Sequence, residues 1–206
     1  DLDAMLGGLH GSELIIIAAR PSMGKTAFAT NIADFVAVEQ REPVLFFSLE
    51  MAKTELALRM LCARGRISGT NLRGRLSQKD MANFTRAAGL LGDAPLYIDD
   101  TPSRTVAEIG AVARRLKRQQ GLGLIIIDYL GLIEPDNTYD SRQEQVAKIA
   151  RRLKGLAREL NVPVVCLSQL NRMTEQMKDN RPRLSHLRES GAIDQDADVV
   201  MYVHRE

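Results

Sequence analysis

The sequence predicts an α/β fold with a mostly parallel central sheet flanked by helices. Strand-like and helix-like segments alternate along the chain, which is the order that builds a parallel sheet. Several strand-like segments, such as 14–19 and 122–127, are continuously apolar, as expected of strands buried on both faces. At 206 residues the chain is long enough for one well-buried core, so we expect a single domain over 1–206.

The first half of the chain begins with a strand over 13–19, a turn at 20–24 and a helix over 25–40. The apolar residues of this helix recur at helical spacing, which gives the helix an inward-facing side. Pro43 precedes the next strand, and Ser77 has the residue type that commonly caps a helix N-terminus. The further elements expected here are a strand over 44–49, helices over 53–64 and 77–91, and a strand over 95–99.

The second half of the chain follows the same alternation. Its longest helix, 141–160, places apolar residues such as Ile149 and Leu153 on one face. The polar stretch 171–184 is rich in Asn, Lys, Arg and Pro, and we expect it to be a mobile loop. The further elements expected are a basic helix over 105–119 and strands over 122–128, 163–167 and 197–203.

The composition excludes several classes of protein. A hydrophobic fraction of 45% and a charged fraction of 26% exclude disordered and collagen-like chains. The longest apolar stretches fall far below the ~20 residues that cross a bilayer, so we expect no membrane span. The chain starts at Asp1 without a secretory leader, which suggests an excised domain. Cys62 and Cys166 lack metal-ligand spacing and fit buried thiols in a reducing cytosol.

Positive charge is concentrated in one helix, although the net charge of the chain is only +2. Such a basic strip could follow the phosphates of a nucleic acid. A solvated helix face accounts for it equally well and is the commoner cause of such a run. Both interpretations stay open from the sequence alone. The basic residues of the strip are Arg142, Lys148, Arg151, Arg152, Lys154 and Arg158.

The segment 19–26 lies where a phosphate-binding loop belongs, because it follows a strand and opens a helix. Ala19 takes the place of the usual first glycine, and alanine can still occupy that turn at negative φ. Gly24 lets the backbone approach an anion, Lys25 supplies charge near the β and γ oxygens, and Thr26 can ligate Mg²⁺. The alternative, a helix start with a solvent-exposed lysine, is disfavoured by the flanking strand and helix. The expected nucleotide-binding residues are Ser22, Met23, Gly24, Lys25, Thr26 and Ala27.

Three polar residues close strands at the expected carboxyl edge of the sheet. Asp128 ends the most apolar strand, from where a carboxylate can reach Mg²⁺. Glu50 closes the strand that we expect next to the phosphate-loop strand, and it could deprotonate a water for attack on the γ-phosphate. A carboxylate at a helix start is the competing interpretation of Glu50. Gln169 could sense the γ-phosphate, although a glutamine after a strand is also ordinary loop chemistry.

Five motifs together resemble the C-terminal motor domain of bacterial replicative DNA helicases, the DnaB family. The resemblance covers nearly the whole chain, and the order of the motifs makes it specific. The motifs are 19–26 (Ala-Arg-Pro-Ser-Met-Gly-Lys-Thr), 48–51 (Ser-Leu-Glu-Met), 127–130 (Ile-Asp-Tyr-Leu), 167–172 (Leu-Ser-Gln-Leu-Asn-Arg), and 187–191 (Leu-Arg-Glu-Ser-Gly) continuing to 194–198 (Asp-Gln-Asp-Ala-Asp).

The resemblance implies a RecA-like P-loop NTPase that works in a ring-shaped homo-hexamer. Such a ring hydrolyses ATP between adjacent subunits with Mg²⁺ as cofactor, moves 5′ to 3′ along single-stranded DNA and unwinds duplex at the replication fork. The family also implies a primase and a helicase loader as partners. The expected location is the bacterial cytoplasm, associated with the nucleoid and not with a membrane.

The family pattern also assigns roles to individual residues. Lys25 and Thr26 would bind phosphate and Mg²⁺, and Asp128 would support the metal. Glu50 would activate water, and Gln169 would couple the γ-phosphate to the DNA loops, so that Glu50, Lys25 and Gln169 form the catalytic set. The residues that match the central-channel loop, which holds the DNA backbone, are Arg188, Glu189 and Gly191. An aromatic content of 4% agrees with phosphate tracking rather than base stacking.

The chain departs from the family pattern in two respects. It contains no counterpart of the family's arginine finger, and Arg205 is not assigned that role. The amino-terminal collar and its linker helix are also missing, so we expect the isolated chain to bind nucleotide but to assemble and turn over poorly. A RecA-like recombination or repair ATPase is the main alternative, which Met23 and the 188–191 segment disfavour. A regulatory or scaffold module that does not unwind DNA is the second.

Overall fold

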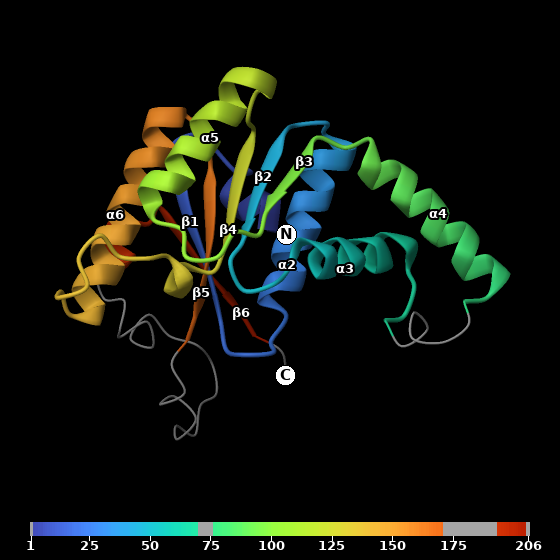
Figure 1. Ribbon diagram of the computed structural model, residues 1–206, viewed down its shortest axis with the longest axis horizontal. Helices are drawn as coiled ribbons and strands as arrows, with labels where there is room; N and C mark the ends of the chain where they lie inside the picture. The colour runs from blue at the N-terminus through green and yellow to red at the C-terminus, as the bar shows by residue number, and fades with distance from the viewer. Residues whose placement is uncertain (1, 70–75, 171–192, 205–206) are drawn as a thin grey trace.

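The computed structural model describes residues 2–69, 76–170 and 193–204, and its centre is a six-stranded parallel sheet (Figure 1). The strand order is β3-β2-β4-β5-β1-β6, and each neighbouring pair is parallel. The predicted fold class is therefore confirmed. The strands are β1 (Leu14–Ala19), β2 (Val44–Ser48), β3 (Leu96–Asp99), β4 (Leu124–Asp128), β5 (Val164–Gln169) and β6 (Val199–Val203).

Helices cover both faces of the sheet and bury its apolar strands. Alternate strand residues face opposite sides, so Ile16 packs with α5 and α6 while Ile17 packs with α2 and α3. This two-sided burial explains why the strands are continuously apolar. The helices are α1 (Leu2–Leu6), α2 (Lys25–Asp34) continued by a π-helix (Phe35–Glu39), α3 (Lys53–Gly65), α4 (Gln78–Gly92), α5 (Val106–Gln120), a 3₁₀ turn (Leu130–Leu132), α6 (Arg142–Leu160) and α7 (Ile193–Asp196).

Local sequence signals fix where the longer helices begin. Ser77 accepts a hydrogen bond from the Asp80 amide and caps α4, as predicted. Ser141 forms a capping box with Glu144 at the start of α6, and Thr105 forms one at the start of α5. The predicted helix over 25–40 is divided, because its last turns adopt the wider π geometry. The short helices α1 and α7 were not predicted, because a segment of four or five residues is too short to show the apolar spacing typical of a helix.

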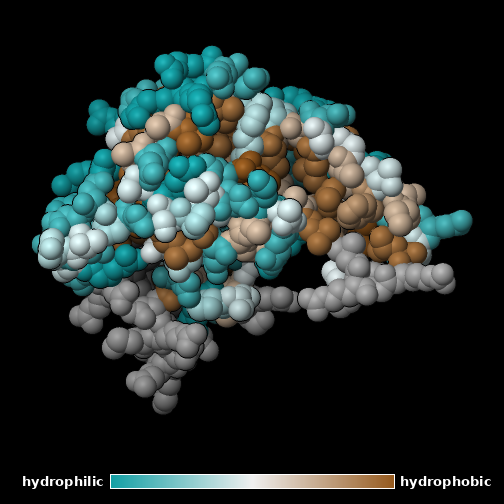
Figure 2. All heavy atoms as spheres, in the orientation of Figure 1, coloured by the Kyte–Doolittle hydropathy of each residue, from teal (hydrophilic) through white to brown (hydrophobic). Residues whose placement is uncertain are grey.

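The α3–α4 pair extends to one side of the sheet and presents apolar side chains there (Figures 1 and 2). Leu58, Met81 and Leu90 are exposed on these two helices. Among the described residues, no helix combines the length and the apolar character that crossing a membrane would require.

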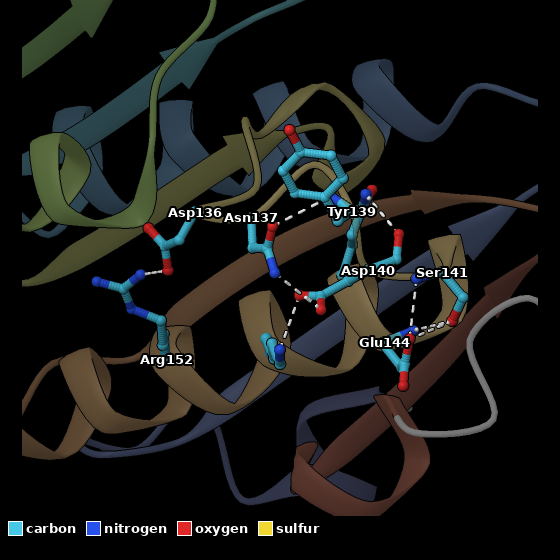
Figure 3. A network of polar contacts seen from close by, with 9 residues as sticks. Asp136, Asn137, Tyr139, Asp140, Ser141, Glu144 and Arg152 are labelled. Atoms are coloured by element: carbon cyan, nitrogen blue, oxygen red, sulfur yellow. Dashed lines mark hydrogen bonds and ion pairs between the residues drawn. The ribbon is translucent and has the colours of Figure 1, made fainter.

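Four of the six basic residues of α6 form ion pairs with acidic residues of neighbouring elements. Arg152 pairs with Asp136, and Lys148 with Asp140 at 2.7 Å, within the turn that precedes the helix (Figure 3). Further along the helix, Arg151 lies 3.6 Å from Asp196, and Lys154 lies 2.7 Å from Asp198. Arg142 donates to the carbonyl of Gly131 at 2.8 Å. The solvated-face interpretation is the one that the contacts favour.

Candidate functional site

The loop between β1 and α2 has the backbone of an anion-binding site. Ser22 and Gly24 have φ values of 63° and 90°, while Met23 between them does not share this left-handed conformation. Such alternation turns successive amides toward one concave surface. No acidic residue lies in the first turn of α2, so the positive end of the helix dipole is not offset there.

The residues predicted to bind nucleotide lie along this loop and the first turn of α2. Ser22, Gly24 and Ala27 are exposed, whereas Met23 is half-buried. Ala19, which replaces the usual first glycine, is fully buried as the last residue of β1 and has negative φ. Alanine therefore fits this position without strain, as expected.

Asp128 meets the two residues that follow Gly24. The Thr26 hydroxyl donates to Asp128 Oδ2 at 2.6 Å, and Lys25 Nζ lies 3.3 Å from Asp128 Oδ1. Asp128 is only 1% exposed, and the Lys25 side chain is 11% exposed. A buried carboxylate needs such partners, because an unpaired charge away from water is very costly. The predicted convergence of Lys25, Thr26 and Asp128 on one place is therefore present.

The donor set at this place fits a magnesium ion. Asp128 Oδ1 is buried and accepts no hydrogen bond, although the ammonium of Lys25 is near it. Carboxylate and hydroxyl oxygens are hard ligands, and Mg²⁺ in nucleotide sites commonly takes one or two carboxylates together with substrate phosphates. Within the described parts of the chain, no group of three or more His, Cys, Asp and Glu side chains gathers as a separate metal site.

Cys166 of β5 is buried in the apolar cluster on the α5–α6 side of the sheet and is chemically quiet. Burial raises the pKa of its thiol, so the group stays protonated and neutral at physiological pH. Cys166 therefore acts as a small apolar residue of the core and adds no charge there.

The position of Glu50 corrects one part of the prediction. Its strand, β2, does not lie next to the phosphate-loop strand, because β4 and β5 separate β2 from β1. The apolar pattern that identifies a buried strand carries no information about which strand lies beside it. Glu50 is instead close to the end of β4, since the amide of the preceding Leu49 donates to the Asp128 carbonyl at 2.8 Å. Glu50 itself is exposed at the same carboxyl edge.

Gln169 ends β5, the strand that lies between β1 and β4. It pairs in register with Ala19 of β1 and has an exposed side chain. Because β5 is flanked by β1 and β4, its carboxyl end lies between the end of the phosphate-loop strand and the end of the Asp128 strand. The predicted placement at the carboxyl edge is confirmed.

One aromatic residue at the site was missed from the sequence. Lys25 Nζ lies over the ring of Tyr129, 4.3 Å from its centroid, a distance at which cation–π attraction operates. The only sequence sign of this contact is an aromatic residue directly after the strand-terminal Asp128.

The predicted DNA-binding residues Arg188, Glu189 and Gly191 lie outside the described residues, as do the expected loop at 171–184 and Arg205. These assignments stay predictions.

The comparisons with known proteins agree with this geometry. The family model described as DnaB-like helicase C terminal domain matches residues 1–206. The chain belongs to this family. The resemblance inferred from the five motifs is therefore confirmed.

Two curated relatives of this DnaB-like domain are replicative helicases. The Replicative DNA helicase DnaB of Geobacillus stearothermophilus is 53% identical over 208 residues, and the Replicative DNA helicase DnaC of Bacillus subtilis (strain 168) is 52% identical over 208 residues. In both comparisons the match covers 100% of this chain and 46% of the relative, so the chain spans about half of their length.

Two solved structures match the fold of this DnaB-like domain closely. One, described as an ATPase domain, has a TM-score of 0.95 at 39% identity, covering 99% of this chain and 73% of that one. The other, a DnaB-like replicative helicase described together with its interactions with primase, has a TM-score of 0.95 at 40% identity, covering 100% of this chain and 51% of that one. The RecA-like ATPase fold is thus confirmed.

Proposed function

We propose that this chain, acting as one domain over 1–206, is the ATP-hydrolysing motor of a replicative DNA helicase. The motor couples Mg²⁺-dependent ATP hydrolysis to 5′–3′ movement along single-stranded DNA and to duplex unwinding at the replication fork. The observation that carries this proposal is the meeting of Lys25 and Thr26 with the buried carboxylate of Asp128. The names of the relatives support the choice of a helicase among the enzymes that share this fold.

The residues of the phosphate loop bind the nucleotide in this proposal. The amides around Gly24 and the N-terminus of α2 hold the β-phosphate, and Lys25 contacts the β and γ oxygens. The Thr26 hydroxyl and the Asp128 carboxylate would hold Mg²⁺, which when bound would offset the negative charge of the phosphates. Lys25 then divides its positive charge between phosphate and Asp128, which keeps the buried carboxylate paired.

Glu50 and Gln169 act on the γ-phosphate side of the nucleotide. Glu50 is exposed at the end of the strand beside β4, so its carboxylate is free to orient a water and accept a proton from it. Gln169 is exposed between β1 and β4, where a neutral amide can contact the γ-phosphate and signal its loss to the residues that follow β5.

Assembly and partners complete the proposal. The motor works as a homo-hexamer whose channel loop, with Arg188, Glu189 and Gly191, holds single-stranded DNA. Exposed apolar side chains on α3 and α4 support a subunit contact there. A primase and a helicase loader act with the ring, and the solved relative described with its interactions with primase supports the former. We place this function in the cytoplasm, at the nucleoid.

Measurements of ATP hydrolysis and of fork unwinding test this proposal. The first measurement is ATP hydrolysis, with and without single-stranded DNA, by a full-length hexamer that carries these residues, with Lys25→Ala as the inactive control. The second is fork unwinding by a full-length hexameric helicase that carries these residues as its C-terminal domain. DNA-stimulated hydrolysis with unwinding is the expected result. Hydrolysis without unwinding would favour a recombination or repair ATPase, and absence of hydrolysis in the hexamer would favour a regulatory module.

A further inference from the structure

Tyr129 is the aromatic residue that contacts the phosphate-loop lysine. Its ring centroid lies 4.3 Å from Lys25 Nζ, and its peptide follows directly on the buried Asp128. The ring is half-buried and packs against the apolar cluster on the α2 side of the sheet. The contact is therefore partly shielded from water, the condition under which cation–π attraction is strongest.

The position of the ring depends on Gly131. A Cβ atom added at Gly131 would lie 2.6 Å from Tyr129 Cε2 and 3.2 Å from an Nη of Arg142. No real side chain tolerates such a distance, so any residue larger than glycine would push the ring away. Gly131 has no left-handed φ, so the need for glycine at this position is steric and not conformational. Arg142 fixes the turn further by donating to the Gly131 carbonyl at 2.8 Å.

We infer that Tyr129 is a positioning residue for Lys25, seated by Gly131. The ring face attracts the ammonium without adding negative charge, whereas Asp128 competes with a phosphate for the same ammonium. A flexible lysine loses side-chain entropy when a ligand fixes it, and a ring that already restrains the ammonium reduces this cost. Tyr129 thus holds the Lys25 ammonium where it can contact a phosphate. This inference adds Tyr129 to the nucleotide site, and it rests on the function proposed above.

Calorimetric titration of this chain with Mg²⁺ and AMP-PNP tests the inference. Tyr129→Leu removes the ring face and is expected to weaken the affinity roughly 3- to 30-fold. Tyr129→Phe keeps the ring and is expected to restore the affinity to within about twofold of wild type. Tyr139→Leu is the matched control, because Tyr139 is 97% exposed on the turn before α6 and is expected to have no effect (Figure 3).

A double-mutant cycle separates positioning from a general structural role. In a Lys25→Met background, Tyr129→Leu is expected to change the affinity by less than about twofold, because the group that the ring holds is gone. An equal loss in both backgrounds would overturn the inference, since the ring would then act on something other than Lys25. If Tyr129→Phe weakened the affinity for AMP-PNP as much as Tyr129→Leu does, the inference would also be overturned, because the effect would then come from the hydroxyl.

Gly131→Ala gives a second route if Tyr129→Leu does not fold, because it keeps the tyrosine and displaces the ring. It is expected to weaken AMP-PNP binding by a similar factor and to remove the upfield ring-current shift of the Lys25 ε-methylene protons in the NMR spectrum. Unchanged affinity in a variant whose ring has moved would overturn the inference alone. If the wild-type chain bound no AMP-PNP, the proposed function would fail and this inference with it.

Discussion

The hydroxyl of Thr26 donates to Asp128 Oδ2 across 2.6 Å and so joins the first turn of α2 to the end of β4. The two residues are 102 positions apart in the chain, and they meet because α2 begins and β4 ends at the carboxyl edge of one parallel sheet. The two oxygens that would hold Mg²⁺ are therefore in contact with each other.

Replacing Lys25 by Ala is expected to weaken binding of Mg²⁺–ATP. The substitution removes a charge-assisted contact to phosphate, a loss that commonly corresponds to roughly 10- to 150-fold in affinity. Isothermal titration calorimetry measures the effect. Lys79→Ala is the matched control, since Lys79 is an exposed lysine on α4 far from the phosphate loop. Equal affinities for wild type and Lys25→Ala would exclude a phosphate-binding role.

Replacing Glu50 by Gln is expected to slow hydrolysis and leave nucleotide binding nearly intact. Glutamine keeps the size of the side chain but cannot accept the proton from water, and loss of a general base commonly costs on the order of 10² or more in rate. Steady-state hydrolysis in a full-length hexamer measures the effect, and Glu55→Gln on the exposed side of α3 is the control. Near wild-type turnover would assign the base to another residue.

Most secondary structure within the described residues was predictable, because local sequence determines it. The predicted strands agree with the observed strands to within two residues at each end, and helix starts such as Ser77 and Ser141 carry capping residues. The strand order was not predictable, and this is why the expected neighbour of the phosphate-loop strand was wrong. The strands that lie beside β1 are determined by how the chain crosses between strands, and the apolar pattern of a single strand contains no information about these connections.

The candidate site was predictable where a motif has a fixed chemistry and not where packing brings residues together. Lys25, Thr26 and Asp128 meet as predicted, because strand ends share one edge of a parallel sheet. The contact of Tyr129 with Lys25 depends on the lack of a side chain at Gly131, which spacing alone does not reveal. Two of the acids that pair with α6, Asp196 and Asp198, follow the helix by more than 30 residues, so their contacts with it could not be read from the basic run itself.

The pH dependence of stability is expected to depend in part on Asp198. Burial alone would raise the pKa of this carboxyl, but hydrogen bonds from Lys154 and from the Leu14 amide outweigh it, so the pKa is lowered. A depressed pKa in the folded state means that the unfolded chain binds more protons. The stabilisation is therefore present above the ordinary aspartate pKa of about 3.9 and is lost as pH falls below it.

Thermal unfolding between about pH 3 and pH 6 checks this expectation for Asp198. Asp198→Asn is expected to lower the midpoint temperature of unfolding most at the upper end of this pH range. The midpoint temperature of this variant is also expected to fall less steeply than that of wild type as the pH decreases. Asp93→Asn is the control, because Asp93 is exposed at the end of α4. If Asp198→Asn lowered the midpoint equally at every pH, its contribution would not come from the charge.

Single-stranded DNA is expected to bind the hexamer through phosphate contacts that do not depend on sequence. In the proposed function Arg188 belongs to the channel loop, and a sixfold ring would present it six times around one channel. Each phosphate contact contributes about −0.7 to the slope of log affinity against log salt for a single strand. Arg188→Ala is therefore expected to lower the affinity similarly for all sequences and to flatten this slope, as measured by fluorescence anisotropy across a salt series.

The ion pairs of α6 supply the matched control for Arg188. Lys148 and Arg152 already pair with Asp140 and Asp136, so their charge is largely offset within the subunit (Figure 3). Lys148→Ala and Arg152→Ala are expected to leave both the affinity and the salt slope unchanged, although each removes the same unit of charge as Arg188→Ala. A larger loss in these variants than in Arg188→Ala would move the DNA contact to α6, because the strand would then have to displace the two aspartates to reach the helix.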